Sequence, residues 1–394
     1  MLFRSLAESP LDTQEIWAGT DDGNIQVSLN GGKSWTEVGQ ILVKQHPYIG
    51  QNASSSRGKR PWISRVTPSV HKKGRCYVTL DNHRYDDMNA YVFVTEDHGK
   101  TWKSIGNNLP EYSVYVIKED NVNPALLFIG TEQGVFFSFN QGQEWHELMG
   151  NMPTVAVYDL VIHPRDGDLV AATHGRSIWI LDDISPLRQL SDQITHKSFH
   201  LFQSKTGTRW LRINTGRKQP YFEFRGQNPR SGAPVNVWIN DQTDSLSIKI
   251  YDEKGKELLR HWKVAVQQGI NRIYWDMQVE EPDSSWIQEI KNMEMALDKL
   301  GNLSALPSGD KDSINQYKTI LKTLSPQDKA GYESLRSKIH SQFGTYGVIL
   351  GKQLKGKRNA PAGKYLLQIK AGTLSESKLI TIREDPLLNE KSFN

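Results

Sequence analysis

Three short copies of one sequence pattern constrain this chain more than any other feature. The segments SLNGGKSW (28–35), TEDHGKTW (95–102) and SFNQGQEW (138–145) carry Ser or Thr, Asp or Asn, Gly and Trp at the same offsets. Trp102 follows Trp35 by 67 residues, and Trp145 follows Trp102 by 43 residues. A period of about 43 residues is typical of one four-stranded β-propeller blade. The longer interval needs an insertion, which we place in the polar stretch 43–61.

The residues of each copy suit a tight hairpin turn. Asp and Asn side chains accept hydrogen bonds from nearby backbone N–H groups, Gly permits positive φ, and Trp is expected to pack back over the turn. We therefore interpret the pattern as structural. Its residues are Ser28, Asn30, Gly32 and Trp35, then Thr95, Asp97, Gly99 and Trp102, then Ser138, Asn140, Gly142 and Trp145. A fourth unit, 155–190, keeps the rhythm of strands but ends in WILDDISPL without Gly or Trp, so it is predicted to be an atypical terminal blade.

The repeated residues are those of the Asp-box, or bacterial neuraminidase repeat. Residues 1–190 resemble the propellers of sialidases, sortilin and xyloglucan-cleaving glycosidases. The runs LLFIGTEQGVFFSFNQGQEW and ATHGRSIWILDD more closely resemble the C-terminal part of large bacterial sortilin-like or glycosyl-hydrolase-like repeat proteins. The resemblance implies an all-β propeller and a periplasmic or extracellular location. It does not imply one activity, because Asp-boxes occur in lyases, hydrolases, receptors and scaffolds.

Polar side chains gather in the connections between the second and third strands of the four units, in GTDDG, TLDNHRYDDMNAY, GTEQG and THGRS. Successive connections of a meandering sheet alternate between its two ends, so these four are expected on the face opposite the Asp-boxes. We call that face the rim. Its candidate ligand-binding residues are Asp21, Asp22, Asp81, His83, Arg84, Asp86, Asp87, Glu132, His174 and Arg176.

Structural roles remain open for several of these residues. Acidic turns are what any hairpin prefers, which applies to Asp21, Asp22 and Glu132. The connection DNHRYDDMNAY is longer than a hairpin needs, and its extra acids, histidine and arginine indicate ligand contact. His174 and Arg176 suit an anionic or sugar group, and they equally suit a contact between blades.

The rim acids also suit two kinds of chemistry. An inverting glycoside hydrolase needs two carboxyl groups about 6.5–9.5 Å apart, and Asp22, Asp81 and Asp87 are the candidates. The Arg-Ile-Pro segment that accompanies Asp-boxes in sialidases is absent from the sequence, so the resemblance to sialidases stops at the fold. No cofactor is required, and carboxylate oxygens would accept Ca²⁺, although their spacing matches no EF-hand.

The second half of the chain follows a different pattern. We expect a linker over 191–218 and a β-sandwich domain over 219–394, because segments such as 235–239, 246–250 and 365–369 alternate apolar and polar residues. This pattern resembles fibronectin-type or immunoglobulin-like sandwiches. Apolar residues at helical spacing predict a helical insertion over 281–345, which is either a locally packed hairpin or an arm that binds a partner.

Composition excludes several classes of protein. Lys and Arg total 48 and Asp and Glu total 44, and the two signs are interspersed, which argues against a nucleic-acid binder. No apolar run approaches the roughly 18 residues that a membrane span requires. Cys76 is the single cysteine, so an internal disulfide is excluded. The N-terminal segment lacks the apolar core of a secretory signal peptide.

The sequence holds about four blades, whereas the families named have six or more. Either the chain forms a compact four-bladed ring, or further blades lie upstream or on another polypeptide, and we favour the second. That hypothesis predicts exposed apolar side chains on the outer faces of the first and fourth blades. We expect the rim to bind a glycan or protein ligand, with the sandwich as an accessory domain. A glycoside hydrolase is the alternative, and a structural assembly module is the second alternative.

Overall fold

The computed structural model describes residues 2–386 except 52, 55–59, 149, 211–227, 229, 242, 281–282, 303–305, 325–327 and 344–356. The chain forms two compact units, Met1–Ser198 and Phe199–Asn394. Each unit is described by itself.

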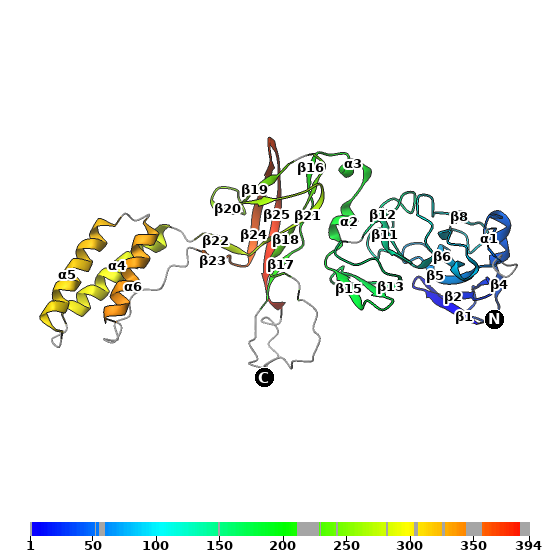
Figure 1. Cartoon of the computed structure of the whole chain (residues 1–394), viewed down its shortest axis with the longest axis horizontal. Coiled ribbons are helices and arrows are strands. Elements are labelled where there is room, and N and C mark those ends of the chain that lie inside the picture. Colours follow the sequence, from blue (N-terminus) through cyan, green and yellow to red (C-terminus); the bar gives the residue numbers. More distant parts are fainter. Residues whose placement is uncertain are drawn as a thin grey trace. The chain divides into compact units, whose positions relative to one another are not determined.

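The first unit consists of four successive antiparallel sheets, each of which meanders from one strand to the next (Figure 1). We call them blades 1 to 4. Blade 1 contains β1 (Phe3–Ser9), β2 (Asp12–Thr20), β3 (Ile25–Ser28) and β4 (Thr36–Glu37). Blade 2 contains β5 (Trp62–Pro68), β6 (Cys76–Asp81), β7 (Tyr91–Thr95) and β8 (Lys103–Ser104). Blade 3 contains β9 (Val114–Glu119), β10 (Leu127–Thr131), β11 (Gly134–Ser138) and β12 (His146–Glu147), and blade 4 contains β13 (Val157–Ile162), β14 (Leu169–Thr173) and β15 (Ile178–Leu181).

Neighbouring blades pack through apolar faces. Trp17 of blade 1 and Ile63 and Phe93 of blade 2 are fully buried in one core. The close approach of blades 3 and 4 depends on a small residue in β10, since a Cβ at Gly130 would lie 2.5 Å from the carbonyl oxygen of Val157. This side-by-side packing of meandering sheets is the architecture of a β-propeller.

The three repeated turns share one hydrogen-bonding pattern. In each, the Ser or Thr hydroxyl accepts the backbone N–H of the Gly four residues later, at 2.8–2.9 Å. The Asp or Asn Oδ1 accepts a backbone N–H four residues later, at 2.9–3.0 Å. Each turn is therefore closed by its own side chains.

The Trp residues of these turns differ in their surroundings. Trp35 packs over its own turn as expected, with its indole N–H donating to the Gly32 carbonyl at 3.1 Å, and it is 39% exposed. Trp102 is buried in the core shared by blades 1 and 2, and Trp145 is buried in the core shared by blades 2 and 3. The indole of Trp145 donates to the Ile105 carbonyl at 2.6 Å, and the Trp102 ring meets the Trp17 ring edge to face with 6.4 Å between their centres. For these two copies, the expected packing over the same turn is wrong.

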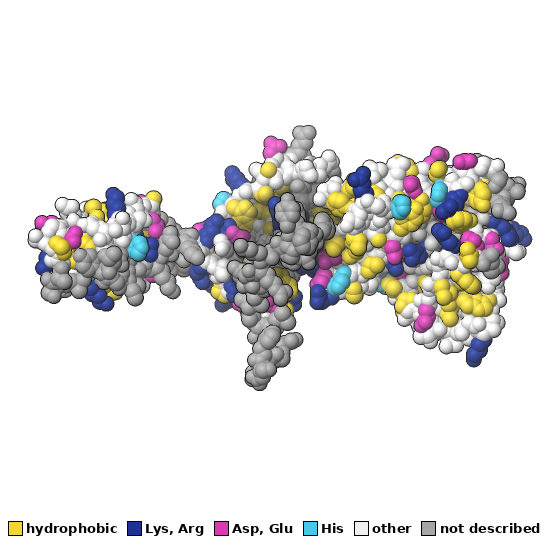
Figure 2. Space-filling view, turned by 60° about the horizontal axis from the view of Figure 1, so that its bottom comes forward, with side chains coloured by type: hydrophobic (Ala, Val, Ile, Leu, Met, Phe, Trp, Pro, Cys, Tyr) yellow, Lys and Arg dark blue, Asp and Glu magenta, His cyan; other side chains and the backbone are white. Residues whose placement is uncertain are grey.

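The two end blades expose apolar side chains, as the sequence predicted. Leu6 of β1 is 67% exposed. In blade 4, Val161, Ile178 and Ile180 are 52%, 65% and 59% exposed. Val161 and Ile180 flank Val170 in the strand register, so they form one row on a single face of the sheet. On the face shown in the space-filling view, apolar side chains are interspersed with charges of both signs (Figure 2).

The second unit contains two sheets that enclose a common core. One holds β16 (Phe199–Leu201), β18 (Ala233–Ile239) and β21 (Gly269–Trp275). The other holds β17 (Gly207–Arg209), β25 (Leu374–Glu384), β24 (Gly363–Ala371), β19 (Ser245–Asp252) and β20 (Leu258–Ala265). A small pair is formed by β22 (Gln278–Glu280) and β23 (Lys357–Asn359). The stretch 191–218, expected as a linker, supplies α3 (Asp192–Thr195) as well as β16 and β17.

Three helices occupy the expected insertion: α4 (Asp283–Gly301), α5 (Ser308–Thr323) and α6 (Lys329–Phe343). They share their own apolar core, which includes Leu297, Ile314 and Ile339. The shorter helices α1 (Gly39–Gln45) and α2 (Ser185–Gln189), together with α3, belong to the first unit. Within the described part of the chain, every helix is too short or too polar to cross a membrane.

Candidate functional site

The inner strand of every blade has a shift in register near its rim end. The shifts lie between Phe3 and Ser5 in blade 1, between Ile63 and Arg65 in blade 2, opposite Gly130 and Thr131 in blade 3, and between Val157 and Asp159 in blade 4. Such β-bulges redirect the extra side chain and are frequent beside binding sites. The extra residues are Arg4, Ser64, Tyr115 and Tyr158.

Two of these bulge residues form an aromatic stack. The rings of Tyr115 and Tyr158 are 4.3 Å apart with 14° between their planes. Tyr115 is buried, whereas Tyr158 is 42% exposed. His174 lies against the Tyr158 ring at 5.5 Å, and the His83 ring lies 6.3 Å from that of Tyr115. Blades 2, 3 and 4 thus contribute to one aromatic group.

Two carboxylates adjoin the stack. The Tyr115 hydroxyl donates to Glu132, whose side chain is exposed. Burial and the Glu132 carboxylate together raise the pKa of Tyr115 far above its ordinary value. Asp81 is buried and accepts the His83 Nδ1 at 2.6 Å. Because a carboxylate only accepts hydrogen bonds, Nδ1 carries the proton and Nε2 is left as the second polar atom of the ring. We call Asp81, His83, Tyr115, Glu132, Tyr158 and His174 the tyrosine cluster.

The other candidate carboxylates have different surroundings. Asp87 is buried, and it accepts Asn82 Nδ2 at 2.7 Å, Asn89 Nδ2 at 2.8 Å and the Tyr91 hydroxyl at 2.9 Å. Asp87 therefore holds the long connection of blade 2 in shape. Asp22 closes its own turn by accepting the Thr20 hydroxyl at 2.5 Å, and this hydrogen bond holds the pKa of Asp22 below its ordinary value. Among the described residues, no hydrogen bond or ring contact joins Asp22 or Asp87 to the tyrosine cluster.

The remaining rim candidates lie outside this cluster. The Arg84 guanidinium lies over the Trp62 ring at 4.3 Å, and the guanidinium of Arg4 lies 4.7 Å from the centre of the same ring. Asp21 accepts the backbone N–H of Leu2 at 2.7 Å. Asp86 has a left-handed backbone conformation, and its side chain is exposed, as is that of Arg176.

Sequence reasoning missed the residues that organise the rim. Tyr115 and Tyr158 lie in strands β9 and β13 rather than in the connections between strands, where the sequence analysis placed the candidate ligand-binding residues. A signal was present, because Trp62, Tyr115 and Tyr158 each stand near the beginning of an inner strand in successive units. The described residues contain no group of three or more His, Cys, Asp or Glu side chains suited to hold a metal ion.

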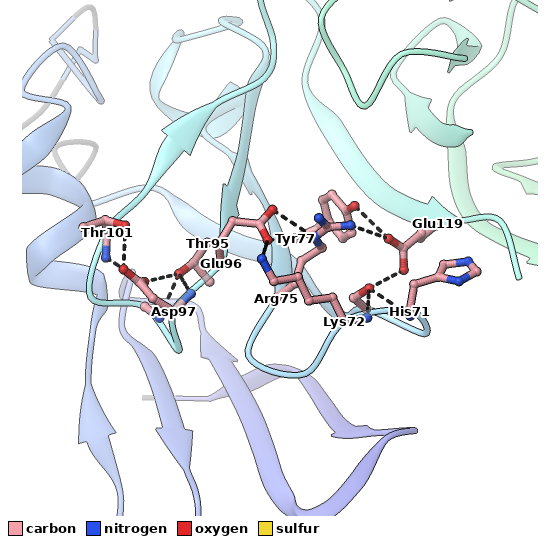
Figure 3. Close-up of polar contacts among 11 residues, drawn as sticks. His71, Lys72, Arg75, Tyr77, Thr95, Glu96, Asp97, Thr101 and Glu119 are labelled. Carbon is pink, nitrogen blue, oxygen red and sulfur yellow. Dashed lines mark hydrogen bonds and ion pairs between the residues drawn. The ribbon is translucent and has the colours of Figure 1, made fainter. Parts of the chain in front are cut away.

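Charged groups at the other end of the inner strands have a structural role (Figure 3). Glu119 is buried, and its carboxylate accepts the Ser69 hydroxyl at 2.6 Å, the Val70 N–H at 2.8 Å and the Tyr77 hydroxyl at 2.9 Å. Arg75 lies 3.4 Å from Glu119 and also pairs with the exposed Glu96 at 2.9 Å. These contacts join blades 2 and 3, and burial raises the pKa of Tyr77 well above its ordinary value.

Comparisons with known proteins give only distant similarities. No family model and no curated protein matches the chain. A GH74 enzyme from Niastella koreensis has 12% identity and a TM-score of 0.34 over 46% of this chain and 28% of that chain. An ancestral GH74 enzyme has 16% identity and a TM-score of 0.35, over 68% and 33% of the two chains. YCF48 from Cyanidioschyzon merolae has 14% identity and a TM-score of 0.31, over 47% and 54%. The chain thus spans about half or less of the length of these structures, and the TM-scores support no functional conclusion.

Proposed function

We propose that the rim of the first unit binds a glycan, and that the exposed ring of Tyr158 is the centre of the site. The observation that carries this proposal is the stack on Tyr115, which covers one face of the Tyr158 ring and leaves the residue 42% exposed. A rigid, exposed aromatic ring offers a large contact area at a small cost in conformational entropy.

The groups around this ring suit the hydroxyls of a sugar. Glu132 supplies exposed carboxylate oxygens, and His83 and His174 supply ring nitrogens. A few polar groups beside an apolar contact surface are the usual composition of a small-ligand site. A protein ligand is the alternative occupant, and the glycan is preferred because the exposed centre is one ring rather than an extended apolar patch.

Membership of the Asp-box family is also our proposal. It is supported by the shared hydrogen bonding of the three turns, in which the Ser or Thr hydroxyl accepts the Gly N–H and the Asp or Asn Oδ1 accepts the backbone N–H of the residue four positions later. With that family we propose an exported protein whose second unit is an immunoglobulin-like accessory domain.

The test compares two aromatic truncations on opposite faces of the unit. Binding of the full chain is screened on a glycan array and quantified by calorimetry, with and without Ca²⁺. Tyr158→Ala is expected to weaken binding about tenfold or more, because central aromatic residues dominate binding energy. Trp35→Ala, which removes a 39% exposed ring from the Asp-box face, is the matched control and should leave affinity unchanged.

Equal affinities for the two variants would refute the proposal. The same glycans are then examined for hydrolysis products. Hydrolysis by the wild type that Asp81→Asn abolishes would replace simple binding with the hydrolase alternative.

A further inference from the structure

A cavity lies at the outer edge of blade 2, away from the inner strands. Its volume is about 460 Å³, within the range of small-ligand pockets. Three segments line it: the part of the insertion between blades 1 and 2 that holds Tyr48 and Gln51, the beginning of β7, and the chain that leads from β8 to β9. We call it the amide pocket, after the polar residues among those that line it, which include Tyr48, Gln51, Asn89, Ser104, Asn107 and Glu111.

The insertion is firmly attached where it forms the pocket wall. Leu42 and Ile49 are buried in the core shared with blades 1 and 2. The His46 Nε2 donates to the Trp102 carbonyl at 3.1 Å, and the Gly50 N–H donates to the Tyr91 hydroxyl at 3.1 Å. The Tyr48 ring is thereby held near that of Tyr91, with 6.4 Å between ring centres, while it remains 45% exposed.

Three carboxamides of the pocket are each held by a hydrogen bond from their NH₂ group. Asn89 donates its NH₂ group to Asp87 at 2.8 Å, Gln51 donates to the Pro47 carbonyl at 2.9 Å, and Asn107 donates to the Gln143 carbonyl at 3.4 Å. Their partners are acceptors only, which fixes the orientation of each amide. Each amide keeps its oxygen as an acceptor, and Gln51 and Asn107 each keep a second N–H as a donor, so these side chains can both accept and donate hydrogen bonds.

The described lining favours a neutral ligand. It includes one acid, Glu111, and among its described residues no Lys, Arg or His to pair with a phosphate or carboxylate. The amides accept and donate hydrogen bonds, as the hydroxyls of a sugar do, and Tyr48, Leu109 and Pro110 add apolar surface. We propose that the amide pocket binds a neutral, hydroxyl-rich carbohydrate of one or two sugar units.

This site is separate from the tyrosine cluster, with which it shares no residue. The long connection of blade 2 lies between them, since Asp81 and His83 belong to the cluster and Asn89 to the pocket, and Asp87 holds it through Asn82 and Asn89. The two proposals therefore stand or fall independently.

The test uses the full chain and four neutral disaccharides: maltose, cellobiose, lactose and xylobiose. Binding is detected by saturation-transfer NMR and quantified by titration. Asn107→Leu removes one amide oxygen at an exposed position, and Tyr48→Ala removes the aromatic wall. Each variant is expected to weaken binding of the recognised disaccharide about tenfold. Trp35→Ala, on the Asp-box face and outside both proposed sites, is the control and should leave this binding unchanged.

Loss of disaccharide binding in Tyr158→Ala together with unchanged binding in Asn107→Leu would overturn the pocket and leave the rim proposal in place. Failure of all four disaccharides to bind would also overturn it. Binding of tetramethylammonium in their place would show that the acceptors serve a cation instead. If Tyr48→Ala lowers the thermal stability of the chain, Asn107→Leu decides the outcome.

Discussion

Removal of the Glu119 carboxylate should strongly destabilise the first unit. In Glu119→Ala, the buried hydroxyls of Ser69 and Tyr77 and the N–H of Val70 lose their acceptor. Each buried polar group left without a partner costs about 1–3 kcal/mol, and breaking a buried charge pair typically costs about 3–5 kcal/mol in total. We therefore expect the free energy of unfolding to fall by about 3–5 kcal/mol. Glu119→Gln keeps one acceptor oxygen and should lose about 1–2 kcal/mol.

Glu96→Gln is the matched control, because Glu96 pairs with the same Arg75 but its side chain is 44% exposed. A pair of this kind contributes at most about 1 kcal/mol. Unfolding in urea is followed by alkylation of Cys76, the single cysteine, which is fully buried in blade 2 and so reports on the first unit. A loss of 3–5 kcal/mol should lower the urea midpoint by more than about 1 M. Equal midpoint shifts for Glu119→Ala and Glu96→Gln would refute the argument from burial.

Two further predictions concern titration and packing. Burial raises the pKa of Tyr91 to about 12, so the folded chain keeps this hydroxyl protonated while the unfolded chain loses the proton near pH 10. The contribution of Tyr91 to stability should therefore be full below pH 10 and fall as pH rises toward 12. Tyr77 and Tyr115, whose pKa values are also raised, act in the same direction, so Tyr91→Phe should remove only part of the alkaline loss of stability; the difference in tyrosinate absorbance between the wild type and Tyr91→Phe checks the ionisation. Gly130→Ala places a Cβ against the Val157 carbonyl and should cost about 1–3 kcal/mol in urea unfolding, whereas Gly309→Ala, where the added Cβ meets open space, should not destabilise the chain.

The repeated turns were predictable because their interactions are local. Each Ser or Thr hydroxyl and each Asp or Asn carbonyl or carboxylate binds a residue four positions later, so eight letters of sequence contain the whole motif. The Trp partners were not predictable in the same way. Trp145 contacts Ile105, forty residues earlier, because each blade packs against the one before it in the chain. The sequence of a single repeat does not show that contact.

The candidate site was only partly predictable for a related reason. The sequence places Asp81 and Asp87 in one acidic connection, but it does not show which carboxylate uses its hydrogen-bonding capacity to hold that connection in shape. The structure does, since Asp87 is buried among Asn82, Asn89 and Tyr91, whereas Asp81 binds the ring of His83. The stack of Tyr115 on Tyr158 depends on bulges in two different sheets. The packing of the blades buries Tyr115 and leaves Tyr158 exposed, which the sequence of either strand does not show.

The unequal surroundings of the three repeat tryptophans give the chain an internal spectroscopic reporter. Trp102 and Trp145 lie in apolar surroundings, whereas the Trp35 indole is partly hydrated. Trp35 should therefore emit at longer wavelength than the other two and be quenched preferentially by iodide or acrylamide. Because the chain has eleven tryptophans and Trp210 is 63% exposed, the emission of Trp35 is obtained as the difference between the wild type and Trp35→Phe. A molecule that covers the first turn should shift this difference toward the blue.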